Sequence, residues 1–409
     1  MTYHDLLAQL LPARRFGVVL GLDRMRAILD RLDAPDRRLG RIVHVGGTNG
    51  KGSTVAMIAA LATAAGQRVA CYTSPHLSCL RERIVIDGAM ISEPAIIAAA
   101  ARVRDAGGDG LTFFEQITAI AMRAIADAEV DVSVIEVGLG GRLDATNVVL
   151  PAVAVVTGVA LDHEAILGGS LAAIAAEKAG IWKPGRPAIV GASGLPEAVP
   201  ALIEAARTAG APVTVIDAAA IAAVPPVGLP GAHQRRNAAA AIAAIRALQL
   251  PIVPAALACV QHPGRFELVT SPLAGVSHLI LDGAHNPHGA AALAEALRER
   301  GERPALIISV SADKDVPAIA AQLAPAVCGV VATRYQQERA MEPAALAKVF
   351  AQLGVAAASA PDLRAALEAA ASYRAPIVIA GSLFLVGEAR TLLLGAATDP
   401  MLVTDPPAR

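Results

Sequence analysis

Short apolar runs alternate with glycine-rich turns and alanine-rich segments along much of the chain. The run Arg41–Val45 leads into the turn Gly46–Gly52 and then into Ser53–Ala65, an apolar segment of helical length. The runs Val130–Val137 and Val153–Val159 also lead into polar or glycine-rich turns, and a helical segment near Leu171–Gly180 follows the second. Alternation of this kind predicts βαβ units on a parallel sheet that is covered on both faces.

A second series of the same kind occupies the last third of the chain. A strand is expected at His278–Leu281, a loop at Asp282–Gly289 and a helix at Ala290–Arg300. Further strands are expected at Pro304–Val310, Val327–Thr333 and Pro376–Ala380.

The stretch Gln261–Pro272, which contains Pro263, Gly264 and Pro272, is the best linker candidate. At 409 residues the chain exceeds the size at which one core keeps growing. We therefore expect an α/β protein with a boundary near residue 268. A P-loop ATPase domain with a mostly parallel sheet would span residues 1–268, and a smaller Rossmann-like α/β domain would span residues 269–409.

The composition is 55% hydrophobic and only 17% charged, which raises the question of a membrane. Much of the apolar share is alanine, however, and no run of about 18 strongly apolar residues is present. The first residues, MTYHDLLAQLLPARRFG, lack the basic start, apolar core and cleavage site of a signal peptide and are expected to begin with a helix. These features predict a soluble, cytoplasmic protein.

The formal net charge is −1, so the chain lacks the excess of positive charge that is typical of nucleic-acid binders. Anionic ligands would have to be held by a few placed cations and backbone amides. The four cysteines show no C-x-x-C spacing, which fits reduced thiols packed in a core.

The strongest local signal is the segment Gly46–Thr54, GGTNGKGST, between a predicted strand and a predicted helix. Glycines let consecutive backbone N–H groups converge on a phosphate, and Lys51 can neutralise its charge. A hydroxyl of Ser53 or Thr54 can then reach Mg²⁺. The strict P-loop pattern is not met, because Val45 stands at the first glycine position and Gly52 at the hydroxyl position. A ligand-free turn is the alternative, but a lysine and two hydroxyls here favour phosphate.

Glu136 and His163 follow predicted strands, and Lys178 lies in a predicted helix. Glu136 ends an apolar strand, where a carboxylate is unfavourable unless it is paired or bound to a cation. Because Mg²⁺ prefers oxygen ligands, Ser74, Glu136 and the loop hydroxyl form a plausible partial shell. The alternatives are a solvated carboxylate for Glu136, a hydrogen-bonded loop histidine for His163 and a solvated helical lysine for Lys178.

The variant Gly47-Thr48-Asn49-Gly50-Lys51-Gly52-Ser53 resembles the ATP loop of the Mur ligase superfamily, and within it that of the dihydrofolate and folylpolyglutamate synthases. Further blocks that resemble this family follow in order along the chain. They are Thr73–Leu77, Thr112–Glu115, Glu136–Asn147, Leu161–His163, Glu177–Ile181, His233–Asn237, Pro263–Arg265, Asp282–Pro287, Asp313–Asp315 and Gly381–Gly387. So many blocks in register indicate membership far more strongly than one would.

The resemblance implies roles for individual residues. ATP is expected to contact Thr48, Asn49, Gly50, Lys51, Gly52, Ser53, Asn237, Arg265 and Asp282. Two Mg²⁺ ions are expected at Ser53, Ser74, Glu136, His163 and Lys178, with Lys178 carbamylated by CO₂. Catalytic roles are implied for Lys51, Lys178, His163 and His285. The pterin is expected at Thr112, Phe113, Phe114, Glu115, Leu143, Asp144 and Ala145, with Gly21 and Leu22 as weaker candidates. Residue-based alternatives are a helix-capping role for Asp282 and core packing for Phe113 and Phe114.

By this resemblance the chain is an ATP-dependent ligase that acts through an acyl phosphate. It would add L-glutamate to dihydropteroate, giving dihydrofolate, and to the γ-carboxylate of reduced folates, and it would act as a monomer. Alternatives are a monofunctional folylpolyglutamate synthase and a Mur-type ligase acting on a UDP-sugar peptide. Residues 1–40 are too few for a UDP-sugar domain. A nucleotide-dependent switch, the third alternative, leaves the Asp282–His285 block without a role.

Overall fold

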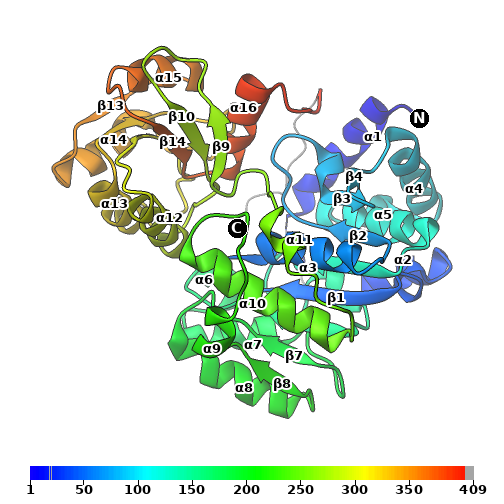
Figure 1. Cartoon of the computed structure of the whole chain (residues 1–409). Coiled ribbons are helices and arrows are strands. Elements are labelled where there is room, and N and C mark those ends of the chain that lie inside the picture. The colour runs from blue at the N-terminus through cyan, green and yellow to red at the C-terminus, as the bar shows by residue number, and fades with distance from the viewer. Residues whose placement is uncertain (18, 20, 401–409) are drawn as a thin grey trace. The chain divides into compact units, whose positions relative to one another are not determined.

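Two compact units make up the chain in the computed structural model, which describes residues 1–17, 19 and 21–400 (Figure 1). Of the described residues, the first unit contains Met1–Gly228, Gln234–Val260 and residues 399–400, and the second contains Leu229–His233 and Gln261–Thr398. The backbone thus passes into the second unit between Val260 and Gln261, a few residues before the expected boundary near 268. That boundary, as a division between functional modules, stays a prediction.

An eight-stranded sheet forms the centre of the first unit, in the order β4-β3-β2-β5-β1-β6-β7-β8. Its strands are β1 (Arg41–Gly46), β2 (Val69–Tyr72), β3 (Ile84–Ile86), β4 (Ala89–Met90), β5 (Val132–Glu136), β6 (Val153–Val156), β7 (Ala188–Val190) and β8 (Val213–Val215). The neighbouring pairs β2–β3 and β3–β4 are antiparallel, and the other neighbouring pairs are parallel. Because β2 and β5 lie on one side of β1 and β6 on the other, the strand order reverses at β1, where ligands bind in open α/β sheets.

Helices cover both faces of this sheet. They are α1 (Tyr3–Leu10), α2 (Asp23–Arg31), α3 (Lys51–Ala64), α4 (Glu93–Asp105), α5 (Phe113–Ala128), α6 (Glu164–Leu167), α7 (Leu171–Ala179), α8 (Val199–Thr208), α9 (Ala218–Ala222), α10 (Ala232–Ala247) and α11 (Ala255–Ala258). Six 3₁₀ helices are η1 (Leu11–Phe16), η2 (Pro35–Arg37), η3 (Leu80–Arg83), η4 (Gly108–Gly110), η5 (Ala145–Val148) and η6 (Pro196–Ala198). One core joins α1, α2, α4 and α5 to Ile42, Ala70 and Ile135 of the strands. Helix α3 packs on β1, β2 and β5, and α7 and α8 pack with β6 and β7 in a further core.

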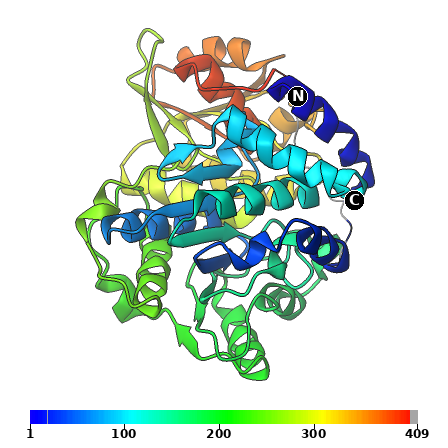
Figure 2. The same cartoon turned by 90° about the vertical axis from the view of Figure 1, so that its right-hand side faces the viewer.

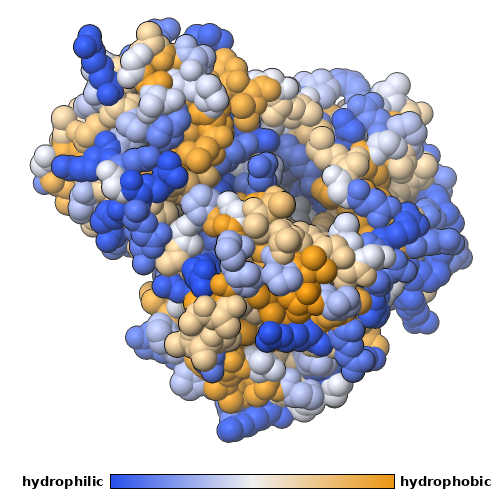
Figure 3. All heavy atoms as spheres, in the orientation of Figure 1, coloured by the Kyte–Doolittle hydropathy of each residue, from blue (hydrophilic) through white to orange (hydrophobic). Residues whose placement is uncertain are grey.

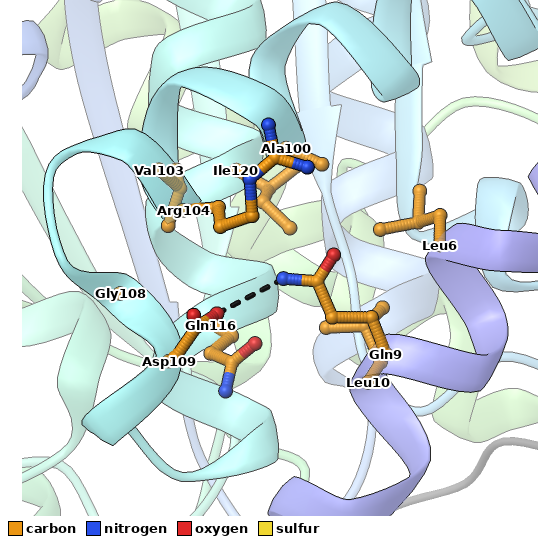
Figure 4. A pocket seen from close by; sticks show the side chains of 10 residues that line it. All are labelled: Leu6, Gln9, Leu10, Ala100, Val103, Arg104, Gly108, Asp109, Gln116 and Ile120. Atoms are coloured by element: carbon orange, nitrogen blue, oxygen red, sulfur yellow. Dashed lines mark hydrogen bonds between the residues drawn. The ribbon is translucent and has the colours of Figure 1, made fainter. Parts of the chain in front are cut away.

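Helix α1 packs on α4 and α5 around a small pocket (Figure 4). There Gln9 Nε2 donates a hydrogen bond to Asp109 Oδ1 at 2.9 Å. The residues lining this pocket include none of those implied for ATP, metal or pterin. The contact therefore explains how the first helix is held, not how a ligand is bound.

The second unit is built on a six-stranded sheet in the order β13-β12-β11-β14-β10-β9. Its strands are β9 (Glu267–Thr270), β10 (His278–Leu281), β11 (Ala305–Ile308), β12 (Gly329–Ala332), β13 (Ala357–Ser359) and β14 (Ile377–Ala380). Only β9 pairs antiparallel. Its helices are α12 (Pro287–Glu299), α13 (Val316–Leu323), α14 (Pro343–Gln352), α15 (Leu363–Ala371) and α16 (Leu383–Leu394), with the 3₁₀ helix η7 (Ala324–Ala326).

The predicted α/β class and the mostly parallel sheets are confirmed (Figure 2). Strand β10 has the predicted bounds, and β1, β5, β6, β11, β12 and β14 lie within one to three residues of theirs. The prediction of a linker at Gln261–Pro272 is partly wrong, because this stretch contains strand β9. In the described part of the chain no helix is long and apolar enough to cross a bilayer. The face drawn in Figure 3 carries both hydrophilic and apolar residues.

Candidate active site

The glycine-rich loop after β1 fits against its neighbours without room for side chains. A Cβ on Gly47 would lie 1.9 Å from Thr157 Oγ1, and one on Gly50 would lie 2.3 Å from Asn237 Oδ1. Both glycines have positive φ, +140° and +83°, which an L side chain rarely adopts. Helix α3 begins at Lys51 with no side-chain cap. Its first N–H groups therefore face the loop, as in sites for phosphate.

Two side chains hold the loop's polar atoms. Thr48 Oγ1 donates to Ala160 O at 3.2 Å and accepts from Ala160 N at 3.0 Å, which ties the loop to the segment after β6. Lys51 folds back over the loop, and its Nζ donates to Gly47 O and Thr48 O, each at 3.2 Å. The lysine that was expected to neutralise phosphate thus lies directly on the phosphate-type loop.

Helix α10 supplies a chain of amide contacts to the same loop. Gln234 Nε2 donates to Ser53 Oγ at 3.3 Å, Asn237 Nδ2 donates to Gln234 Oε1 at 3.0 Å, and Ser193 Oγ donates to Asn237 Oδ1 at 2.7 Å. The structure therefore brings together Ser53 and Asn237, which are 184 positions apart (237 − 53). Ser193 was missed, because nothing in its local sequence signals a partner so far along the chain.

Glu136 and Ser74 meet where β5 and β2 end. Ser74 N donates to Glu136 Oε2 at 3.3 Å, and the Glu136 carboxylate is only 5% exposed. The Ser74–Pro75 peptide is cis. A buried carboxylate next to a serine residue at the carboxyl edge of a sheet supplies oxygen atoms of the kind that Mg²⁺ prefers.

His163 lies in the turn after β6, directly before α6. Its φ is +54°, and its backbone N–H donates to Asp162 Oδ1 at 2.9 Å. In the described residues no three His, Cys, Asp or Glu side chains converge as a metal site. A metal here would therefore need donors of other kinds, such as the serine hydroxyls and a modified Lys178.

Lys178 is buried in the last turn of α7, so the alternative of a solvated surface lysine is wrong. Its Nζ donates to Gly47 O at 3.2 Å. Burial first, and then the charge of Lys51, lower the pKa of Lys178 to about 7. A large fraction of this amine is therefore neutral near pH 7, which is the form that can react with CO₂.

The segment Thr112–Glu115 opens helix α5 with a reciprocal cap. Glu115 Oε2 accepts from Thr112 N and Thr112 Oγ1, each at 2.8 Å, and Glu115 N donates to Thr112 Oγ1 at 3.3 Å. Arg24 of α2 also donates to Glu115 Oε2, at 2.8 Å. Leu22, which directly precedes α2, is buried, and Gly21 before it has a φ of +144°. The N-terminal segment is thereby tied to the start of α5.

The two phenylalanines of this segment have different surroundings. Phe113 is fully buried in the core, with the Arg83 guanidinium 5.3 Å from its ring centroid. Phe114 is half-buried, and a Cβ on Gly138 would lie 2.3 Å from its ring. Phe114 therefore packs directly on the loop that follows β5.

That loop, residues 138–147, contains the segment expected from the resemblance to face the acceptor and is called the acceptor loop below; Asp144 organises it. Asp144 Oδ2 accepts from Leu139 N at 2.8 Å, while Oδ1 accepts from the N–H and hydroxyl of Thr146. Burial raises the pKa of Asp144, and these hydrogen bonds oppose the rise. Leu143 is half-buried and Ala145 is buried. The Asp144 carboxylate thus has its main partners inside the loop.

His44 of β1 contacts Thr146 of the acceptor loop. Its Nε2 lies 2.9 Å from Thr146 Oγ1, and the residue is fully buried. Burial first, and then the charge of Lys183, lower the pKa of His44 to about 3, so it is neutral. Sequence reasoning missed His44, although a histidine inside the apolar run RIVHV was a usable signal.

In the second unit, Arg265, Asp282 and His285 lie on one loop cluster. The Arg265 guanidinium rests on Gly283, where a Cβ would lie 2.2 Å from its Nη1. Asp282 accepts from Phe266 N and Ala284 N, each at 2.9 Å. Burial raises the pKa of Asp282, and the positive charge of Arg265 opposes it. His285 Nδ1 lies 2.8 Å from Gly283 O.

The helix-capping alternative for Asp282 is wrong. Helix α12 is capped by Asn286, whose Oδ1 accepts from Gly289 N at 2.8 Å. The turn beside Arg265 is instead braced by Glu267, which accepts from Gly264 N at 2.8 Å and from Arg390 Nε at 2.9 Å. Glu267 and Arg390 were not singled out from the sequence, since they are 123 positions apart.

Two family models match this chain. The Mur ligase middle domain matches residues 45–193, and the Mur ligase glutamate ligase domain matches residues 264–383. These ranges contain the glycine-rich loop and acceptor loop, and the Arg265–His285 cluster, respectively.

Curated relatives extend the match over nearly the whole chain. A probable bifunctional folylpolyglutamate synthase/dihydropteroate synthase of Haloferax volcanii is 36% identical over 434 residues, covering 96% of this chain and 50% of that protein. This chain therefore spans half the length of the Haloferax protein. The dihydrofolate synthase/folylpolyglutamate synthase of Mycobacterium tuberculosis is 35% identical over 441 residues, covering 91% of this chain and 89% of that protein.

Solved structures of proteins with the same names are also similar to this chain. A Mycobacterium tuberculosis folylpolyglutamate synthase complexed with ADP superposes with a TM-score of 0.87 at 34% identity, covering 97% of this chain and 100% of that one. E. coli FolC in complex with DHPP and ADP gives 0.87 at 30% identity, covering 97% and 98%. A bifunctional folylpolyglutamate synthase/dihydrofolate synthase with Mn, AMPPNP and L-glutamate gives 0.83 at 32%, covering 95% and 98%. The chain belongs to the dihydrofolate synthase/folylpolyglutamate synthase family of Mur ligases.

Proposed function

We propose that this chain uses ATP to join L-glutamate to dihydropteroate, giving dihydrofolate, and to the γ-carboxylate of reduced folates. The observation that carries the proposal is the pair of lysines on one loop carbonyl: Lys51 Nζ and Lys178 Nζ both donate to Gly47 O at 3.2 Å. Two amines gathered on a glycine-rich loop suit anionic phosphate, and the buried one suits carbamylation. The ADP, DHPP and L-glutamate in the related structures support the same substrates.

The reaction would proceed in two steps. The γ-phosphoryl group of ATP passes to the acceptor carboxylate, giving an acyl phosphate and ADP. The amino group of glutamate then attacks the acyl carbon, loses a proton and displaces phosphate, which leaves an amide. The chain's own contribution is positioning and charge neutralisation, by loop N–H groups, by Lys51 and by Arg265.

Two divalent metal sites are part of the proposal. Ser53, Ser74 and Glu136 would hold one Mg²⁺, and His163 with carbamylated Lys178 would hold the second. When bound, these ions would offset the charge on the phosphate oxygens. The Mn and AMPPNP in a related structure support a metal with the nucleotide. In carbamylation the neutral Lys178 amine attacks CO₂ and loses one proton, which turns a cation into an oxygen-donating anion.

Further roles are proposed on the strength of the family's pattern. Asn237, Asp282 and the loop residues Thr48–Gly52 would contact ATP, and His285 would act in catalysis. Thr112–Glu115 and Leu143–Ala145 would line the pterin pocket. Residues 1–268 would then form the ATP-binding module and residues 269–409 the glutamate ligase module.

A single assay tests the function. Purified protein, ATP and Mg²⁺ are incubated with dihydropteroate or tetrahydrofolate, with and without glutamate, and ADP release is measured. We expect glutamate-dependent ADP release with both acceptors, and none from Lys51→Ala. Release with tetrahydrofolate alone would indicate a monofunctional folylpolyglutamate synthase. Release that needs neither acceptor nor glutamate would indicate a nucleotide-hydrolysing switch and would overturn the proposal.

A further inference from the structure

The buried side-chain amide of Asn147, the last residue of the acceptor loop, connects that loop to the segment that follows the Lys178 helix. Asn147 Nδ2 donates to Arg142 O in the loop at 2.9 Å and to Gly180 O after α7 at 3.0 Å. Its Oδ1 accepts from Lys183 Nζ at 2.8 Å. Both donors and the acceptor of the amide are thereby engaged, while the residue is only 5% exposed.

The backbone of the loop touches the backbone of the helix where this amide binds. A Cβ on Gly141 would lie 2.8 Å from Glu177 O and 2.9 Å from Lys178 O. A Cβ on Gly180 would lie 2.3 Å from the Cβ of Arg142. Because no side chain separates the two segments, a displacement of one is passed directly to the other.

Lys183 binds the oxygen of the Asn147 amide. Its ammonium is half-buried and faces the Asn147 oxygen, and it holds the amide so that the two N–H groups point at the two carbonyls. Amides and ammonium groups are seldom withdrawn from water without a specific role. Neither residue was assigned a role in binding or catalysis above.

We propose that Asn147, oriented by Lys183, is a positioning residue that couples the acceptor loop to the Lys178 helix. The loop segment Leu143–Ala145, which faces the acceptor, and Lys178, which faces the loop carbonyl of Gly47, are then placed as one body. Binding of the acceptor and formation of the second metal site are coupled through this amide. The inference rests on the proposed function for what the two segments bind, but the mechanical coupling itself is independent of it.

Hydrogen exchange tests the coupling without any assay of activity. Amide exchange is measured in the unliganded full chain for residues 138–147 and 171–183. In Asn147→Ala we expect both segments to exchange at least about tenfold faster, while the β1 strand is unchanged. Faster exchange of the loop alone, or of neither segment, would overturn the proposal.

Kinetics test what the coupling does. Asn147→Ala is expected to raise the KM for dihydropteroate and the Mg²⁺ concentration for half-maximal rate, each by about tenfold or more, with the Kd for ADP changed less than about twofold. A purely structural defect would change all three or lower only the melting temperature. Unchanged KM and Mg²⁺ values would overturn the proposal.

Two substitutions distinguish the effect of the Asn147 N–H groups from the effect of the space that its side chain fills. Asn147→Asp keeps the shape and can still face Lys183, but it cannot donate to the two carbonyls, so we expect it to be as impaired as Asn147→Ala. Wild-type behaviour of Asn147→Asp would overturn the proposal. Lys183→Met should shift the same quantities in the same direction by a smaller factor, and it should add little to Asn147→Ala.

Arg186→Met is the matched control for Lys183→Met. Arg186 is exposed and lies three positions further on, so exchange and kinetics should match the wild type. If the wild-type chain released no ADP with either acceptor and glutamate, the proposed function would fall. The exchange result for Asn147→Ala would still decide the coupling.

Discussion

The buried side-chain amine of Lys178, in the last turn of helix α7, donates a hydrogen bond to the backbone carbonyl of Gly47 at 3.2 Å. This contact places the amine beside the glycine-rich loop, where its pKa of about 7 makes the neutral form accessible. The proposed role of Lys178 depends on whether this amine is carbamylated or stays a free amine. Substitutions of Lys178 distinguish the two.

Lys178→Arg and Lys178→Ala should both lose at least about 99% of glutamate-dependent ADP release, a loss of about 2.7 kcal/mol in transition-state stabilisation. Arginine keeps the positive charge but cannot form the carbamate, so charge alone does not rescue. Acetate should partly restore Lys178→Ala, because a small carboxylate can occupy the vacated space. An active Lys178→Arg enzyme would contradict the carbamate. The exposed Lys348→Ala serves as the control and should stay within about 0.5 kcal/mol of wild-type stability.

Lys51→Ala should reduce turnover to less than a tenth, which corresponds to about 1.4 kcal/mol or more. In the described part of the chain, Lys51 Nζ donates hydrogen bonds to two carbonyls of its own loop, Gly47 O and Thr48 O. Its loss should therefore leave the thermal midpoint close to the wild-type value. Calorimetry with ADP measures the binding defect directly. Retention of more than about a tenth of wild-type turnover would show that this loop does not bind the nucleotide.

Glu136→Gln should raise the Mg²⁺ concentration needed for half-maximal rate by about tenfold or remove activity, since the amide keeps the shape but loses the charge a hard cation prefers. The amide oxygen can still accept the hydrogen bond from Ser74 N, so folding should be little affected. A magnesium titration of ADP release is the measurement. Superimposable titrations of the two proteins would identify Glu136 as a strand-end carboxylate without a metal.

His44 should make the protein less stable as the pH falls. Its pKa is about 3 in the folded chain against an ordinary value of 6.5, so the unfolded state takes up a proton that the folded state does not. The stabilisation is complete above pH 6.5 and is lost as the pH falls toward 3. At pH 4.5 the loss from this group is about 2–3 kcal/mol.

Urea unfolding of the wild type and His44→Gln between pH 7 and 4.5 measures this effect. The glutamine variant is expected to be less stable at pH 7, because the packing is altered. Its free energy of unfolding should nevertheless fall less steeply with decreasing pH. Parallel pH profiles for the two proteins would rule out His44 as the titrating group.

Much of the fold followed from periodicity, because the central strands are buried on both faces and therefore form continuous apolar runs. Strand β8 escaped this reasoning, since Val213 and Val215 are exposed at the sheet edge and the run is only three residues long. Strand β9 escaped because prolines and a glycine surround it. The pair β3 and β4 was not predicted, because no helical segment lies between these two antiparallel strands.

The candidate site divides in the same way. Lys51 begins the helix after a glycine-rich turn and Glu136 ends a buried strand, and both are positions where the sequence pattern predicts chemistry. The supporting contacts join distant positions: Ser193 with Asn237, and Asn147 with Lys183. Spacing along the chain carries no information about such pairs, which only the folded backbone brings together. Lys178 was found by resemblance, but its burial and its lowered pKa required the structure.

Asp144 receives three hydrogen bonds from its own loop, and this limits how the enzyme could be redesigned for other acceptors. A library that randomises the whole loop would mostly lose the loop's shape before it changed selectivity. Leu143 is half-buried, whereas Ala145 belongs to the main core of the first unit. If Leu143 faces the acceptor as proposed, variation at position 143, with Asp144 and Thr146 retained, would change acceptor preference while the loop keeps its shape.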